Sequence, residues 1–218
     1  TPKPSSAASD VYKRQVQVTE MFRDPEYYIG LRRHVMPLLH TYPSLKLWVA
    51  GCSSGEEAWS LAILLAEEGL LERSIIYATD INTLALETAQ AGVYPLSRMA
   101  EYTRNHRMAG GRSSLSDYYT AAYDHAKFDE RLKRHLVFSD HSLATDSVFA
   151  EMQFVSCRNV LIYFNRGLQD RALGLFHESL CIGGFLGLGS KESLGFSRHA
   201  HAFTEIAPQE RIYQKASA

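Results

Sequence analysis

The stretch that decides the fold is VAGCSSGEEAWSLAILLAEEG, residues 49–69. It begins with apolar residues of the kind found in buried strands, passes through a turn between Gly51 and Gly55, and continues in a helical pattern that ends at a glycine. Two neighbouring carboxylates, Glu56 and Glu57, stand where the helix begins. This order predicts a strand, a tight turn and a helix, which form one unit of an α/β fold.

The alternation of strand and helix continues along the chain. We expect strands at residues 45–50, 74–80, 135–140, 152–159, 183–190, 202–206 and 210–216, and helices at residues 25–39, 56–68, 82–92 and 166–181. Strands that are buried on both faces of a parallel sheet show continuous apolar runs, and LKLWVA (45–50) is such a run. The sequence therefore predicts an α/β fold with a parallel central sheet.

Composition and charge exclude several classes of protein. The 218 residues are 45% hydrophobic and 22% charged, which predicts one globular domain with a sizeable core. A formal net charge of -1 gives no basic surplus for nucleic acid or anionic lipid. The apolar runs fall short of the roughly 20 residues of a membrane span, and no secretory leader opens the chain. We therefore expect a cytoplasmic protein without membrane insertion.

The cysteine and histidine patterns indicate no metal site. Cys52, Cys157 and Cys181 are widely spaced and form no CxxC pair, unlike a disulfide framework or a zinc site, and we expect them to be buried apolar residues. The nine histidines are dispersed. We predict no metal-binding residues.

Two segments differ from the rest of the chain. Residues 1–10 are rich in Pro, Ser and Ala, and DVYKRQ (10–15) resembles the translation of a sequencing adapter. We expect residues 1–15 to be a disordered leader or a sequencing scar, in the latter case with natural sequence upstream, and residues 16–218 to be the domain. Residues 93–134 are polar and rich in tyrosine, and we interpret them as an inserted subdomain, partly helical and with a small hairpin.

The glycine turn has the geometry of a nucleotide-type site. Gly51 and Gly55 lie between a strand and a helix, and Asp80 closes the next strand. Glycines let a ligand approach the backbone, a helix start offers N–H groups, and an acidic residue accepts hydrogen bonds from ribose hydroxyls. An ordinary tight connection is the more frequent explanation of such glycines, and Asp80 alone also fits a helix cap.

The two glutamates distinguish between possible ligands. Carboxylates in the turn would repel the pyrophosphate of NAD, whereas they would attract a cation. S-adenosylmethionine carries a ribose, an ammonium and a sulfonium but no phosphate, so Glu57 and Asp80 suit it as ligands. Glu56 is expected to interact with the helix dipole instead. The sequence thus predicts an S-adenosylmethionine site.

Five ordered motifs resemble one known family. They are VTEMFRDPEYY (18–28), LWVAGCSSGEEAWSLAILL (47–65), IYATDIN (76–82), AGVYPL (91–96) and CRNVLIYF (157–164). Together they are similar to the CheR family of chemotaxis protein-glutamate O-methyltransferases, from about residue 16 to residue 215. The likeness is to the catalytic domain, and the helical domain that precedes it in the family is missing from these residues. It implies a Rossmann-like S-adenosylmethionine-dependent methyltransferase fold, in which an antiparallel closing strand joins the mostly parallel sheet.

The resemblance also implies roles for individual residues. The cofactor-binding residues expected at matching positions are Thr19, Arg23, Gly51, Glu57, Asp80, Arg158 and Asn159. Arg23 and Tyr163 are implied to be catalytic, Arg23 by orienting the acceptor carboxylate and Tyr163 by hydrogen bonding near the methyl group. A salt bridge of Arg23 with Asp24 or Glu20, and a core role for the Tyr163 ring, remain open.

Two positions depart from the family pattern. Gln17 stands where the family usually has Asn, and the pair Ser142 and Leu143 stands where it has Asn and Leu. We expect these residues to contact the cofactor too. Ser142 is shorter than Asn and lacks an amide donor, so cofactor binding should be weakened and not abolished.

Methyl transfer to a glutamate needs no general base, because a carboxylate with a reference pKa of about 4.3 is ionised at neutral pH. A site that excludes water and holds the reacting groups together is sufficient. By resemblance, the acceptor is a glutamate on a cytoplasmic helix of a chemoreceptor. Two alternatives remain, namely a methyltransferase for another substrate and a module that binds S-adenosylmethionine for sensing or as a scaffold without catalysis.

Overall fold

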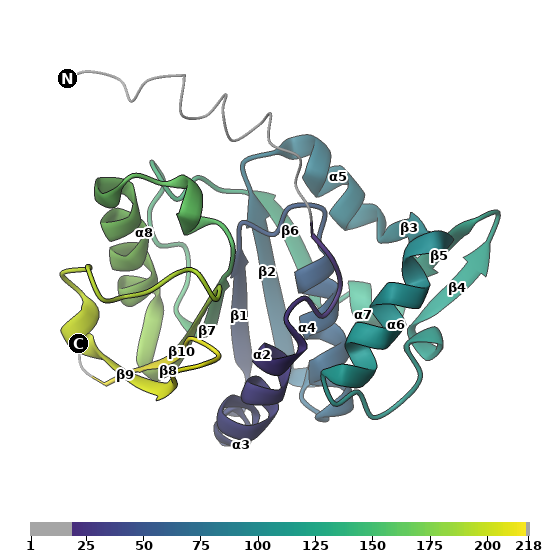
Figure 1. Cartoon of the computed structure of the whole chain (residues 1–218), viewed down its shortest axis with the longest axis horizontal. Coiled ribbons are helices and arrows are strands. Elements are labelled where there is room, and N and C mark those ends of the chain that lie inside the picture. Colours follow the sequence, from purple (N-terminus) through teal and green to yellow (C-terminus); the bar gives the residue numbers. More distant parts are fainter. Residues whose placement is uncertain (1–18, 217–218) are drawn as a thin grey trace.

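Within residues 19–216, which the computed structural model describes, the strand, turn and helix of the opening stretch form the centre of an α/β sheet (Figure 1). Its seven strands lie in the order β6 (Leu136–Asp140), β2 (Ser74–Asp80), β1 (Leu45–Ala50), β7 (Met152–Cys157), β8 (Leu180–Leu188), β10 (Ile212–Lys215) and β9 (Phe203–Ala207). The first five are parallel, and β10 is antiparallel to both of its neighbours. The predicted α/β class, with a mostly parallel sheet and an antiparallel closing strand, is confirmed.

Helices cover both faces of this sheet. The α-helices of the described residues are α2 (Pro25–Gly30), α3 (Met36–Leu39), α4 (Glu56–Glu67), α5 (Thr83–Ala91), α6 (Met99–Met108), α7 (Glu130–Lys133) and α8 (Arg166–Ser179), of which α6 and α7 pack against α2 and α4, respectively. Successive side chains of a strand point to opposite faces. Leu47 of β1 therefore packs in the cluster that contains α4, whereas its neighbour Trp48 packs in the cluster that contains α8. The central strand is thus buried on both faces, as its continuous apolar run predicts.

The order of the strands determines where a ligand can bind. From β1 the sheet grows through β2 to β6 in one direction, and through β7 to β8 in the other. Neighbouring loops at the carboxyl ends of β1 and β7 therefore diverge to opposite faces, and such a switch point is where α/β sheets bind ligands. The glycine turn follows β1 at this edge.

The turn after β1 is tight because two glycines adopt a backbone conformation that side chains disfavour. Gly51 and Gly55 have φ angles of +77° and +93°. A Cβ on Gly55 would lie 2.6 Å from the Cβ of Ala89 in α5, and one on Gly51 would lie 2.4 Å from Cγ2 of Val160, which follows β7. The turn therefore packs directly against α5 and against the loop after β7.

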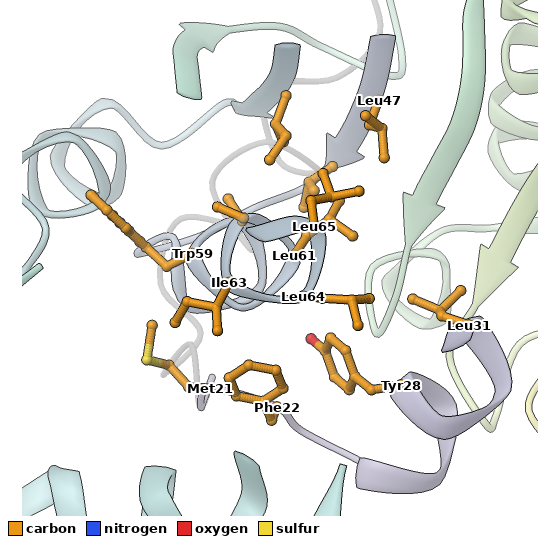
Figure 2. Close-up of a cluster of buried hydrophobic side chains, with 14 of the residues drawn as sticks. Met21, Phe22, Tyr28, Leu31, Leu47, Trp59, Leu61, Ile63, Leu64 and Leu65 are labelled. Carbon is orange, nitrogen blue, oxygen red and sulfur yellow. The ribbon is translucent and has the colours of Figure 1, made fainter. Parts of the chain in front are cut away.

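The segment before α2 is fixed against α4. Met21, Phe22 and Tyr28 are buried and pack with apolar residues of α4, as Figure 2 shows. The Phe22 N–H also donates a hydrogen bond of 2.9 Å to the Ser60 hydroxyl of α4. Arg23 and Asp24, between Phe22 and α2, are therefore held at a defined place on the core, although they belong to no regular element.

A second, smaller antiparallel sheet forms the inserted subdomain that the fold prediction included. Its strands lie in the order β3 (Val93–Pro95), β5 (His125–Phe128) and β4 (Tyr119–Ala122). Glu67 at the end of α4 anchors this part of the chain, because its carboxylate lies 2.9 Å from Nε2 of His106, accepts a 3.0 Å bond from the amide of Arg112 and pairs with Arg32. Burial raises the pKa of Glu67, but the bonds from His106 and Arg32 outweigh it and hold the pKa at about 2.

The sequence prediction differs from the structure most clearly at three elements, while other boundaries shift by one or two residues. The helix expected over residues 25–39 contains a π-type turn at Leu31–Val35, between α2 and α3. The strand expected over residues 152–159 ends at Cys157, and Asn159 adopts a left-handed φ of 59°. Strand β8 begins earlier than expected, at Leu180, where α8 ends without an intervening loop.

The remaining expectations about whole segments have mixed outcomes. Cys52 and Cys157 are buried free thiols as expected, whereas Cys181 is partly exposed. Residues 1–15 and Gln17 lie outside the described residues. None of the helices in residues 19–216 combines the length and the apolar character that crossing a bilayer requires.

Replacing Gly55 by alanine should destabilise the fold more than the same change at Gly69. Both glycines have positive φ, so each variant carries the cost of a left-handed alanine, about 1–2 kcal/mol. Only Gly55 adds a collision, because its Cβ would lie 2.8 Å from the Cα of Ala89, whereas a Cβ on Gly69 meets nothing within 4 Å. Urea denaturation should show a further loss of about 1–3 kcal/mol for Gly55→Ala. Equal losses would contradict this account of the turn.

Candidate active site

The carboxylate of Asp80 joins the glycine turn to the end of β2. Asp80 is 2% exposed, and its two oxygens accept hydrogen bonds from the amides of Ser53 (2.8 Å) and Asn82 (2.9 Å). The amide of Gly51 also donates to the carbonyl of Thr79, at 2.8 Å. A carboxylate oxygen has two lone pairs. Asp80 can therefore hold the turn and accept from ligand hydroxyls with the same group.

Glu57 is directed toward β7. Its Oε1 accepts a 2.5 Å hydrogen bond from the hydroxyl of Ser156, and its Oε2 lies 3.6 Å from Nη1 of Arg158. Burial raises the pKa of Glu57, while Arg158, Ser156 and Arg23 each lower it and leave the net shift upward. With 18% of its side chain exposed, this carboxylate is accessible to a ligand at the switch point.

Glu56 has different neighbours and is more buried. It is 4% exposed, and its carboxylate accepts bonds from the hydroxyls of Ser54 (2.8 Å) and Tyr102 in α6 (3.4 Å). Burial raises the pKa of the nearby Cys52 thiol, and the negative charges of Asp80, Glu57 and Glu56 raise it further. The glycine turn and the end of β2 therefore bring three carboxylates close together, which favours a cationic ligand.

Arg158 is a buried cation at the end of β7. Its side chain is 2% exposed and lies over the ring of Tyr27, with 4.1 Å between Cζ and the ring centre. Its Nη2 donates to Oδ2 of Asp24 (2.6 Å) and to the carbonyl of Arg23 (3.2 Å). Within residues 19–216, its Nε and Nη1 have no hydrogen-bond partner. Buried guanidinium N–H groups of this kind fit a carboxylate ligand.

The loop after β7 also carries Asn159 and Tyr163. The amide of Asn159 donates a 3.0 Å bond to the carboxylate of Glu192, which lies in the loop after β8. Tyr163 ends a short 3₁₀ helix (Leu161–Tyr163), and half of its surface is exposed, so its ring is not a core residue. The structure thus places Arg158, Asn159 and Tyr163 on one short loop at the switch point.

Three other predicted residues, Thr19, Ser142 and Leu143, lie on segments outside this loop. The carbonyl of Thr19 accepts a 3.0 Å bond from Arg98, which lies directly before α6. The amide of Ser142 donates to Asp146, and Leu143 is buried at 6% exposure in the cluster that contains α8. The amide of His141 donates to the carbonyl of Asp80 at 3.3 Å, so the loop of Ser142 and Leu143 starts next to Asp80.

The sequence-based selection missed three residues of this region. Ser156 binds Glu57, Tyr27 lies under Arg158 with its hydroxyl 2.8 Å from Ser156, and Glu192 binds the loop after β7. A signal existed for two of them. Ser156 is a polar residue inside an apolar strand, and Glu192 follows the carboxyl end of a strand, the rule that selected Asp80.

A family model described as the CheR methyltransferase SAM-binding domain matches residues 17–211. The chain belongs to the CheR methyltransferase family. It is 59% identical over 201 residues to a Pseudomonas putida protein named putative methyltransferase Cher3, covering 92% of this chain and 74% of that protein. It is 30% identical over 181 residues to a chemotaxis protein methyltransferase of Listeria monocytogenes, covering 82% of this chain and 66% of that protein. A solved structure of the glycopeptide N-methyltransferase MtfA complexed with sinefungin has a TM-score of 0.48 and 10% identity, covering 80% of this chain and 52% of that one.

The cofactor of this CheR-family domain is S-adenosylmethionine, and its fold is that of an S-adenosylmethionine-dependent methyltransferase. The residues at the carboxyl edge fit the cofactor chemically. We propose that Glu57 binds its ammonium and Asp80 its ribose hydroxyls, because both groups are hydrogen-bond acceptors. The N–H groups of Arg158 that lack a hydrogen-bond partner then match its carboxylate.

Glu57→Gln should weaken cofactor binding by about 10- to 100-fold, because a hydrogen bond to a charged group contributes about 1.5–3 kcal/mol. Burial raises the pKa of Glu57, so the affinity of the parent should fall as the pH drops through that raised pKa and the carboxylate is neutralised. The variant should bind more weakly with no such pH dependence. Calorimetric titration with S-adenosylhomocysteine between about pH 5 and 8 measures both effects.

Glu56→Gln is the matched control, because the Glu56 carboxylate binds Ser54 and Tyr102 and not Ser156. Its affinity for the cofactor product should remain within about threefold of the parent value. Equal losses in the two variants would show that the general negative charge of the turn, and not Glu57 itself, binds the ligand.

Proposed function

We propose that this protein transfers the methyl group of S-adenosylmethionine to glutamate side chains on cytoplasmic helices of methyl-accepting chemoreceptors, forming glutamate methyl esters. One observation carries the proposal. Nη1 of Arg158 lies 3.6 Å from the Glu57 carboxylate, and Nη2 of Arg158 donates to the carbonyl of Arg23, so two arginines suited to an anion stand next to a carboxylate suited to a cation. A sulfonium donor and a carboxylate acceptor require this combination at the point where they meet.

The relatives support the acceptor as well as the donor. The Listeria monocytogenes protein is named as a chemotaxis methyltransferase, and this chain spans about two thirds of its length. The Pseudomonas putida protein, which is 59% identical, carries only the name of a putative methyltransferase. A receptor glutamate as acceptor is therefore our proposal, with residues 16–218 as the methyltransferase domain, residues 93–134 as its inserted subdomain and the cytoplasm as its location.

The reaction needs positioning and charge, and no base. An acceptor carboxylate with a reference pKa of about 4.3 is ionised at neutral pH. The bound cofactor supplies an electrophilic methyl group on a positively charged sulfur. With the cofactor bound, the acceptor oxygen would take the methyl group while sulfur kept the electron pair of the broken carbon–sulfur bond, so no residue of the chain would have to move a proton. Opposite charges disappear as the bond forms, and a site that replaces water around both groups assists that step.

In this mechanism the residues of the chain hold the two reactants. Glu57 holds S-adenosylmethionine near β7 by binding its ammonium group. Arg23, on the segment that Phe22 anchors to α4, orients the acceptor carboxylate. Tyr163 lies half exposed on the loop after β7, and its hydroxyl donates a hydrogen bond near the methyl group or the acceptor oxygen. Holding the reacting atoms near attack distance, about 3–3.5 Å, supplies much of the rate enhancement.

Arg23→Ala should remove methylation and leave the fold intact. Arg23 is partly exposed and its carbonyl, which the variant keeps, is what accepts the bond from Arg158. We expect turnover to fall by about 100-fold or more, because the acceptor loses its orienting cation. Transfer of labelled methyl groups to receptor cytoplasmic fragments measures it, with Glu and with Gln at the acceptor positions.

Arg33→Ala is the control, because it removes an exposed arginine from the π-type turn Leu31–Val35, which follows α2. It should retain parental turnover. If Arg23→Ala stayed within a few-fold of the parent, the role of Arg23 would be wrong. Cofactor binding without transfer to any receptor fragment would instead favour a sensing or scaffold module, and transfer to a different acceptor would favour another substrate.

A further inference from the structure

Four backbone amides converge on the carboxylate of Glu192. Oε1 accepts hydrogen bonds from the amides of Val160 (2.8 Å) and Leu161 (2.7 Å), and Oε2 accepts from the amides of Asn159 (3.0 Å) and Gly189 (2.7 Å). The residue is only 4% exposed. A buried carboxylate is costly unless it is hydrogen-bonded, and here each oxygen has two donors. Glu192 therefore binds the loop after β7 to the loop after β8.

The local backbone explains why an anion is needed at this place. Asn159 has a left-handed φ of 59°, and the three successive amides from Asn159 to Leu161 point at one spot. Successive N–H groups in such a turn form a concave site for an anion. Without Glu192 they would be buried without partners, at about 1–3 kcal/mol each. The protein thus supplies its own anion to the three amides at the start of this loop.

The approach of the two loops also requires a glycine. A Cβ on Gly189 would lie 2.7 Å from Oε2 of Glu192 and 2.8 Å from the amide nitrogen of Asn159. On its other side the loop contacts the glycine turn, since Val160 lies where a Cβ of Gly51 would be. The position of the loop is therefore set by two glycines and one carboxylate.

The loop that Glu192 fixes is the one that carries site residues. Arg158 directly precedes the three bound amides, and Tyr163 ends the 3₁₀ helix that begins at the last of them, Leu161. The charge of Glu192 also reaches the cofactor side of the site, because it adds to the effect of burial in raising the pKa of Glu57.

We propose that Glu192 is a positioning residue for methyl transfer: its carboxylate holds the loop after β7 in the shape that directs Arg158 and Tyr163 to the carboxyl edge of the sheet. The inference rests on the proposed methyltransferase activity for its kinetic consequences, but not on the identity of the acceptor. In this proposal Glu192 acts only through the amides that it binds and contacts neither the donor nor the acceptor.

The test compares Glu192→Gln and Glu192→Asp with a control at the other end of β8. Glutamine replaces one acceptor oxygen by an NH₂ group that faces backbone donors, whereas aspartate keeps the charge on a shorter side chain. Lys215→Met is the control, because Lys215 is also buried (7% exposed) and its Nζ donates to the carbonyls of His177 (2.8 Å) and Leu180 (2.9 Å). It therefore removes a buried charge with backbone partners where β8 begins, far along the strand from Gly189.

For Glu192→Gln we expect kcat to fall by about 100-fold, because misplaced groups at the reacting centre have effects of that size. The KM for the acceptor should stay within about threefold, since Arg23 lies on a different segment, and the Kd for S-adenosylhomocysteine should rise by about tenfold. Glu192→Asp should restore part of the loss. In the absence of cofactor, hydrogen exchange at the amides of residues 159–161 should become faster in Glu192→Gln and remain unchanged in Lys215→Met.

Several outcomes would overturn the proposal. One is a folded Glu192→Gln protein with parental kcat and Kd, and another is an equal loss of both in Lys215→Met, which would indicate general destabilisation. If Glu192→Gln fails to fold, Gly189→Ala strains the same contact and keeps the carboxylate, and unchanged binding and exchange in that variant would also contradict the proposal. The binding and exchange measurements need no acceptor, so they stand even if receptors prove not to be the substrate.

Discussion

The site depends on one physical constraint, which is that the turn after β1 must fold directly onto the end of β2. Gly51 and Gly55 allow this through positive φ angles and through the absence of a Cβ where α5 and Val160 approach. The Asp80 carboxylate then binds the amide of Ser53 and fixes the turn in place. Helix α4 begins at the end of this turn. The same contact therefore also fixes the position of its first residues, Glu56 and Glu57.

The two halves of the sheet use the same device on either side of the switch point. Asp80 follows β2 and binds amides of the turn after β1 and of its own loop, whereas Glu192 follows β8 and binds amides of the loop after β7 and of its own loop. In each case a buried carboxylate accepts the backbone hydrogen bonds that water accepts in exposed loops. These hydrogen bonds in turn offset the cost of burying the charge. The loops are therefore held by charge-assisted hydrogen bonds and not by apolar packing alone.

This arrangement leaves opposite charges side by side at the edge. Glu57 faces Arg158 at 3.6 Å, and Arg158 is held by Asp24 and by stacking on Tyr27. These charged side chains are already oriented before the reactants bind. A reaction between a positive donor and a negative acceptor is therefore assisted, because the site needs little reorganisation when the reactants arrive. Burial keeps these groups away from the screening of bulk solvent.

The sequence by itself determined the fold class and the glycine turn, because strand and helix periodicity and the conformational freedom of glycine act over short distances. The different roles of Glu56 and Glu57 stay a prediction of the same kind. The sequence also indicated that Asp80 ends its strand, whereas the strand before Arg158 was predicted two residues too long. Only the tertiary structure decided the partners: that Ser156 binds Glu57, that β8 follows α8 without a loop, and that Glu192 binds three successive amides some thirty residues away along the chain. Such contacts depend on which strands become neighbours, and no local pattern encodes that choice.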